Sequence, residues 1–240
     1  EYKSNFYAHL FGDMFNILVV MVFYNVYMDI TSDSFLNWTL LDFLTFFLIV
    51  NFSVKFRNCF FFWGFNVYVI KGQLNMLLTK PVPAYLQITS NAWRSGRVFT
   101  TPIVFMAMVC IIILGDYTNY LLAFIAWMIG WVGNLFLYNS LEVLKFFFPK
   151  GVGLKPLFSD SHNIVRNFTF APFENSNLIS NILLGLFPMA LVVYVSFQIL
   201  NGDTGYFYGY IWFLITYSLI VILLNIFIWR KGLKRYEAFG

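Results

Sequence analysis

Few side chains in this sequence could do chemistry, and they are scattered. The chain has two histidines, His9 and His162, and two cysteines, Cys59 and Cys110. Histidines this far apart do not suggest a metal site, and cysteines inside apolar runs are expected to act as small apolar residues. The sequence also lacks a phosphate-binding loop, a zinc-protease motif, a C-x-x-C pair and a nucleophile elbow. We therefore predict that the chain is not an enzyme and holds no metal or cofactor of its own.

One cluster of ionisable residues raises a sharper question. His162 and Arg166 are four residues apart and would share a helix face, whereas Asp160 and His162 would point apart. Ionisable groups inside a membrane helix usually face a cavity or each other, so these residues could line a substrate path. They could also lie in a solvated loop, which we favour because such groups are rarely buried unpaired. Asn134 is a second candidate for the path, although hydrogen bonding between helices is the role that we favour for it.

The composition indicates the elements that must position these residues. Of 240 residues, 60% are hydrophobic, 22% are aromatic and 11% are charged. An ordinary soluble domain has about 25% charged residues. This composition excludes a soluble enzyme, a disordered chain and a disulfide scaffold, and it predicts a membrane protein.

Six segments come close to the roughly 20 apolar residues that a helix needs to cross a bilayer. We predict an all-α polytopic transmembrane helical bundle, built as a single domain over residues 1–240. The segments are about 11–28, 38–62, 98–114, 120–143, 178–200 and 209–229. In the fourth, Ala126, Gly130 and Gly133 form a ridge of small residues, which we expect to pack within the chain.

The topology of residues 151–200 has two interpretations. In the first, residues 151–174 are a cytoplasmic loop and residues 178–200 are the fifth span. In the second, the polar stretch is the fifth membrane helix and residues 178–200 form a re-entrant pair, interrupted at Pro188. Irregular backbone at membrane depth is tolerated only where protein or water covers it. Both interpretations place residues 201–205 on the outer side.

The charges predict the orientation. All 15 Lys and Arg residues can be placed on or near one side of the membrane, whereas the opposite loops carry only Asp29, Asp33, Asp116 and Asp203. Basic residues collect on the cytoplasmic side, so both termini are predicted to be cytoplasmic in the plasma membrane. We attribute the net charge of +4 to this orientation and expect no nucleic-acid partner.

Residues 66–83 are the most informative cytoplasmic segment. Val69, Leu74, Leu77 and Leu78 can share one helical face, and Pro81 stops the helix. A short amphipathic helix between two spans has two interpretations. It can lie on the membrane surface, or it can dock into a groove of a partner protein.

Three motifs in register resemble one family of proteins. The run I-K-G-Q-L-N-M-L-L-T-K-P-V (70–82) is similar to the I-x-x-G-x-L-x-x-x-L-x-[KR]-P stretch of ABC type-2 permeases. The end of the chain, W-R-K-G-L-K-R-Y-E-A-F-G (229–240), resembles that family's W-[KR]-x-G-[LI]-[KR]-x-Y-x-[SA]-x-G. Residues 171–175, 187–190 and 198–202 are similar to its Pro-rich exit region. The resemblance covers nearly the whole chain.

This resemblance implies a function. Such permeases have six membrane segments per half, and two halves form an exporter as a homodimer or heterodimer. Each half binds a separate cytoplasmic ATPase subunit, which holds the ATP and Mg²⁺. The resemblance also favours a re-entrant fifth region near the exit side. The coupling helix that contacts the ATPase would be formed by Lys71, Gly72, Gln73, Leu74, Leu77, Leu78, Lys80 and Pro81.

Two other classes of function compete with this interpretation. An ATP-independent secondary transporter or channel predicts ionisable relay residues deep in several spans, or an inverted repeat. Neither is evident in the sequence apart from the segment that includes Asp160 and Arg166. An integral membrane enzyme would need a histidine or acidic cluster, which two distant histidines do not provide.

Overall fold

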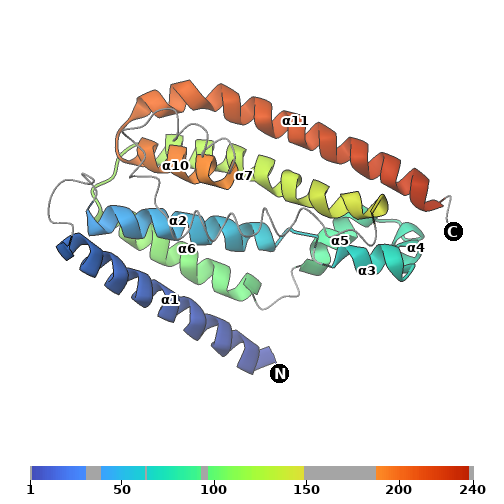
Figure 1. Cartoon of the computed structure of the whole chain (residues 1–240), viewed down its shortest axis with the longest axis horizontal. Coiled ribbons are helices and arrows are strands. Elements are labelled where there is room, and N and C mark those ends of the chain that lie inside the picture. The colour runs from blue at the N-terminus through green and yellow to red at the C-terminus, as the bar shows by residue number, and fades with distance from the viewer. Residues whose placement is uncertain (1, 31–38, 63, 93–96, 149–187, 238–240) are drawn as a thin grey trace.

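The computed structural model describes residues 2–30, 39–62, 64–92, 97–148 and 188–237. Every regular element in these ranges is helical, as predicted. The elements are α1 (Tyr2–Ile30), α2 (Leu40–Asn58), α3 (Phe65–Ile70), α4 (Gln73–Leu78), α5 (Ala84–Ala92), α6 (Arg97–Leu114), α7 (Tyr120–Val143), the 3-10 turn η1 (Leu144–Phe146), α10 (Pro188–Leu200) and α11 (Thr204–Glu237). Figure 1 shows the long helices lying side by side along the longest axis of the molecule.

Two helices form the centre of the bundle. Residues Phe43 to Val50 of α2 are all buried, and so are residues Leu191 to Phe197 of α10. Helices α1 and α6 pack on α2, whereas α7 and α11 pack on α10 and on each other. The main core therefore lies between α2 and α10 and is covered by the other long helices.

Two of the described helices are long and apolar enough to cross a membrane. They are Tyr120–Phe146 and Thr204–Tyr236, and shorter apolar stretches occupy Met14–Phe23, Thr100–Leu114 and Leu191–Leu200. Helix α2 carries polar residues such as Asn51, Lys55 and Arg57, which lower its hydropathy although it is central. The count of six membrane segments stays a prediction.

The small-residue ridge of α7 packs within the chain, as expected. A Cβ added at Gly130 would clash with Val192 of α10, and one added at Gly133 would lie 2.6 Å from Ser218 Oγ of α11. Ser218 also donates to the Ile129 carbonyl at 2.7 Å. Small residues let helix backbones approach closely, and here they place α7 against both α10 and α11.

Helix α10 bears on the topology of residues 151–200. It begins at Pro188, a favoured residue for a first helical position, and has 13 residues. At 1.5 Å per residue it extends about 20 Å, less than the roughly 30 Å of a hydrocarbon core. Residues 149–187, including Asp160, His162 and Arg166, lie outside the described part of the chain.

The two ends of the bundle differ in charge. Helices α3, α4 and α5 and the C-terminal end of α11 gather at one end in Figure 1. Exposed Lys71 and Lys80 lie in the turns that flank α4, and exposed Arg230 and Lys231 lie in α11. The turns that hold Asp116 and Asp203 lie at the other end. We call these the basic end and the acidic end.

A hydrogen-bonded cap closes the acidic end. Thr39 and Asp42 form a capping box at the start of α2. The hydroxyl of Tyr117, in the turn between α6 and α7, lies 2.8 Å from Asp42 Oδ1 and 3.0 Å from Thr45 Oγ1. Burial, reinforced by the Asp42 carboxylate, raises the pKa of Tyr117, so its hydroxyl stays protonated. These contacts join the α6–α7 turn to the start of α2.

Candidate functional site

The predicted coupling segment folds as two short helices instead of one. Helix α3 ends at Ile70 and α4 begins at Gln73, with Gly72 between them. Gly72 has φ +69° and ψ +7°, a left-handed conformation that glycine adopts without a steric penalty. The chain therefore turns sharply at the glycine of the I-K-G-Q-L run.

The turn separates the residues of this segment into an inner and an outer set. Leu74 is fully buried and Leu77 nearly so, and both belong to a second core cluster at the basic end. Ile70, Met76 and Leu78 are exposed apolar side chains, and Met76 is 64% exposed. The other predicted coupling residues are also exposed: Lys71, Gly72, Gln73, Lys80 and Pro81. We call the exposed set, with Ile70 and Met76, the docking surface.

This distribution refines the predicted coupling helix. Leu74 and Leu77 were expected on the same face as Leu78, but they are used by the chain's own core. Gln87 of α5 also holds α4 and the turn after it in place. Its Nε2 donates to the Leu77 carbonyl at 3.0 Å and also to the Val82 carbonyl. Leu74 and Leu77 therefore support the docking surface from below and cannot contact a partner themselves.

An aromatic cluster lies beneath the docking surface. We call it the inner aromatic cluster: Phe62, Phe65, Tyr85, Phe146, Trp229 and Tyr236. The Trp229 ring is 5.2 Å from Tyr85, 5.8 Å from Phe146 and 5.9 Å from Phe65, measured between centroids. These rings come from α3, α5, η1, α11 and the turn after α2, so the cluster joins five parts of the chain. Aromatic pairs at such distances contribute about 0.5–1.5 kcal/mol each beyond their buried area.

The C-terminal motif is explained by this cluster. Trp229, Leu233 and Tyr236 recur at spacings of four and three, so they lie on one face of α11 and pack on the cluster. Gly232 lies on the same face, and a Cβ added there would clash with the Phe146 ring. Arg230, Lys231, Lys234 and Arg235 are exposed. The W-R-K-G-L-K-R-Y pattern thus combines residues that pack on the cluster with exposed basic residues.

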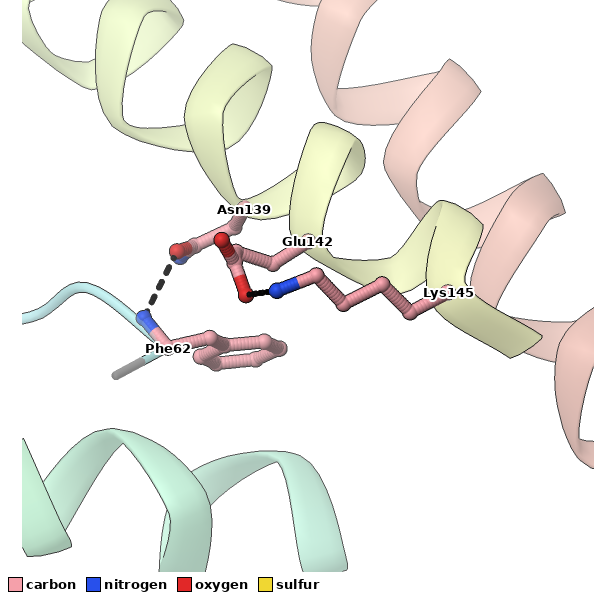
Figure 2. A network of polar contacts seen from close by, with 4 residues as sticks. All are labelled: Phe62, Asn139, Glu142 and Lys145. Atoms are coloured by element: carbon pink, nitrogen blue, oxygen red, sulfur yellow. Dashed lines mark hydrogen bonds and ion pairs between the residues drawn. The ribbon is translucent and has the colours of Figure 1, made fainter. Parts of the chain in front are cut away.

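A polar network connects the basic end to α7, as Figure 2 shows. Asn139 Oδ1 accepts from the Phe62 backbone N–H at 3.1 Å, and its Nδ2 lies 3.5 Å from the Tyr85 hydroxyl. Less than one helical turn further along α7, buried Glu142 pairs with Lys145 Nζ at 2.6 Å. Burial raises the pKa of Tyr85 to about 12, partly offset by its hydrogen bond to Asn139. The hydrogen bonds of Asn139 hold the turn after α2 against α7, and the charge of Glu142 nearby is paired with that of Lys145.

The candidate substrate-path residue that the structure describes is Asn134. It is 1% exposed on α7, and neither polar atom of its amide has a hydrogen-bond partner. Leaving such a buried group unsatisfied costs about 1–3 kcal/mol, so an unpaired amide needs a reason. The other candidates, Asp160, His162 and Arg166, lie outside the described residues, so they are not brought together with Asn134 here.

Sequence reasoning missed a charged residue inside the bundle. Arg57 lies in the last turn of α2, where its side chain is buried, and its guanidinium lies 4.1 Å from the Tyr138 ring centroid. A cation over an aromatic face is stabilised by the ring quadrupole, more so when desolvated. Tyr138 is four residues after Asn134 on α7, which places Arg57 near the candidate path. The sequence offered no signal for this pairing, because the two residues are 81 positions apart.

No metal site emerges from the ranges that the structure describes, where no three His, Cys, Asp or Glu residues gather. Both cysteines are free, Cys59 buried and Cys110 exposed.

A comparison with protein-family profiles gives a match. The sequence profile of a family described as ABC-2 family transporter protein matches residues 14–240. No curated protein and no solved structure matches the chain.

Proposed function

This chain belongs to the ABC-2 transporter family, and we propose that it forms one permease half of an ATP-driven exporter. Membership in this family makes the chain a membrane permease component of an ABC transporter, not a catalytic subunit. In our proposal a second permease half, identical or related, completes the substrate path. Separate ATPase subunits hold ATP and Mg²⁺. Each half has six membrane segments, the fifth with a re-entrant part, and both termini are in the cytoplasm at the plasma membrane.

The docking surface is the observation that carries this proposal. It exposes Ile70 at the end of α3 and Met76 in α4, with Lys71 next to Ile70 and Lys80 after the end of α4. Exposed apolar side chains rimmed by charge are typical of protein-binding sites. The membrane surface is the other place for such a segment, but Leu74 and Leu77 are turned into the protein core. The outer set is too small and too interrupted by Gly72 to form the long apolar stripe of an interfacial helix.

The inner aromatic cluster supplies a route for motion in this proposal. An ATPase that moves the docking surface would push on Leu74 and Leu77, which pack with Phe65 and Phe146. These contacts lead to the ends of α7 and α11, the two longest apolar helices. Packed interiors transmit strain because they contain few voids. ATP binding would thereby rock one half against the other and open the path outward.

Asn134 is our proposed path residue, and Asp160, His162 and Arg166 would join it only if residues 151–174 form a membrane helix instead of the cytoplasmic loop that we favour. The unpartnered amide of Asn134 supports this role, because a passing polar group would satisfy it.

Coupled ATP hydrolysis tests the proposal. The tagged chain, co-expressed with its ATPase subunit and reconstituted, should give a complex that hydrolyses ATP and is inhibited by vanadate. Met76→Glu should abolish stimulation of the ATPase, because a carboxylate would be buried in the interface. Asn201→Glu is the matched control, since it adds the same charge at an exposed position of the acidic end. Equal stimulation of the ATPase by both variants would show that the ATPase does not dock at Met76.

The alternative is an ATP-independent secondary transporter or channel. Buried Arg57 and Glu142 are the described residues that such a mechanism would use, but one stacks on Tyr138 and the other pairs with Lys145. Transport by the reconstituted chain alone, without ATP and without any ATPase subunit, would establish the alternative and reject the exporter.

A further inference from the structure

An apolar cavity of about 440 Å³ lies between α6 and α7, away from the docking surface and from Asn134. Its walls are two stripes with helical spacing, Phe105, Met108, Val109 and Ile112 on α6 and Tyr120, Ala123, Phe124 and Trp127 on α7. Such a stripe ordinarily packs against another rod-shaped element. Here α6 packs on α2, and α7 packs on α10 and α11, so the two stripes face each other across open space. Residues of α2 and α10 form the floor.

The cavity offers almost nothing to a polar ligand. The Ser196 hydroxyl on its floor donates to the Val192 carbonyl at 2.7 Å, and the Trp127 indole N–H donates to Ser53 Oγ at 2.6 Å. The lining backbone belongs to helices, whose amides are already bonded. Pockets for polar molecules normally place a few free polar groups to orient the ligand. This wall instead presents the rings of Phe52, Phe105 and Phe124 around Trp127.

We infer that this cavity binds one acyl chain of a bilayer phospholipid. An acyl chain has no hydrogen-bonding atoms, which matches a wall whose interior polar groups are already used. The rim residues Phe105, Ile113 and Phe124 are exposed, so the cavity opens onto the surface that the bilayer surrounds. The α6 stripe from Phe105 to Ile113 is about 12 Å long at 1.5 Å per residue, an elongated shape that suits a chain.

The head group would lie at the acidic end. Tyr120 is the first residue of α7 and lines the cavity next to the turn that holds Asp116. Tyrosines are enriched at the level of lipid head groups, where the ring is apolar and the hydroxyl is wet. The inference depends on the chain lying in a membrane and not on ATP or on export, so it can fail independently of the proposed function.

Fluorescence quenching by brominated lipid tests the inference. Bromine on an acyl chain quenches a tryptophan only on contact, and Trp127 is just 6% exposed. The chain would be placed in nanodiscs of phosphatidylcholine with and without dibrominated acyl chains. The signals of Trp127, Trp131 and Trp212 are obtained by subtracting the Trp127→Phe, Trp131→Phe and Trp212→Phe variants from the wild type.

The three tryptophans provide their own controls. Trp212 is 73% exposed and should be quenched by surrounding lipid. Trp131 is 5% exposed and does not line the cavity, but its ring lies 6.0 Å from that of Trp127, so it should be quenched less than Trp127. We expect Trp127 to lose fluorescence as Trp212 does. A Trp127 signal that survives like that of Trp131 would overturn the inference, whether the cavity is empty or covered by a second copy of the chain.

A filling variant separates entry into the cavity from contact at its rim. Ala123→Phe places a ring in the cavity and should restore the Trp127 signal in brominated lipid. Gly209→Phe is the control, because a side chain at Gly209 of α11 meets nothing within 4 Å. If both variants keep the wild-type loss of fluorescence, the acyl chain does not occupy the cavity. If Ala123→Phe does not fold, the comparison of Trp127 with Trp131 and Trp212 still tests the inference.

Discussion

At the scale of single residues, Gly72 sets the shape of the docking surface. Its φ of +69° lies in the region where an L side chain costs about 1–2 kcal/mol, although a Cβ there would meet nothing within 4 Å. Gly72→Ala should therefore lower the thermal unfolding midpoint and weaken ATPase stimulation. Gly72→Asn should have the smaller effect, because Asn tolerates this conformation better than Ala. Wild-type behaviour of the Ala variant would show that the turn is not left-handed.

Asn139 is the second residue whose role is specific. Its side chain accepts the buried Phe62 N–H, so Asn139→Ala leaves that donor unsatisfied at a cost of about 1–3 kcal/mol. We expect a lower unfolding midpoint in detergent for this variant. Asn75→Ala, at an exposed position of α4, should leave the midpoint unchanged. Equal midpoints for the two variants would contradict the role of Asn139 as a link between α7 and the turn after α2.

Tyr85 gives a prediction on pH. Its pKa is about 12 in the folded chain against 10 for free tyrosine, because burial disfavours the phenolate. Between these values the unfolded chain has lost a proton that the folded chain keeps, so the free energy of unfolding falls as pH rises, by at most about 1.4 kcal/mol per pH unit. Below pH 10 both states are protonated and this dependence is absent. Tyr85→Phe should show a shallower fall in the alkaline range, and an unchanged slope would mean that Tyr85 titrates normally.

At the scale of elements, the end of α11 is the most informative. Gly232 touches the Phe146 ring so closely that a methyl group has no room, whereas Gly209 of the same helix faces open space. Alanine in place of glycine inside a helix otherwise stabilises it by about 1 kcal/mol. We therefore expect Gly209→Ala to hold or raise the unfolding midpoint and Gly232→Ala to lower it. A stabilising Gly232→Ala would show that α11 does not pack on the inner aromatic cluster.

The same elements show what the sequence could predict. Apolar length and charge placement were enough to predict an all-helical membrane chain, and the tail motif identified its family. The spacing of Leu74 and Leu77 predicted an amphipathic helix, but periodicity does not say whether an apolar face packs on the chain's own core or on a partner. The burial of Arg57 depends on contacts distant in sequence, whereas the break at Gly72 is local and lies at a glycine with φ +69°. Helices that are apolar all round, such as the middle of α10, give no periodic signal of which side faces the core.

At the scale of the whole molecule, the separation of charge predicts the orientation in the membrane. The exposed basic residues of the turns that flank α4 and of the α11 end lie at one end of the bundle, and Asp116 and Asp203 lie at the other. Because basic residues are retained on the cytoplasmic side, the acidic end should face outward. Labelling with a membrane-impermeant maleimide tests this orientation, after both natural cysteines are replaced by alanine.

Two single-cysteine variants report on the two ends. Asn201→Cys lies in the exposed turn between α10 and α11, and Lys234→Cys lies on the exposed side of the α11 end. In intact cells Asn201→Cys should be labelled and Lys234→Cys should not, whereas permeabilised cells should label both. The reverse pattern would show that the chain has the opposite orientation in the membrane. The docking surface would then be out of reach of any cytoplasmic ATPase. Labelling of both positions in intact cells would mean that the bundle does not span the membrane between them. Because the docking surface and Lys234 share the basic end, this one measurement constrains the orientation and the proposed source of energy together.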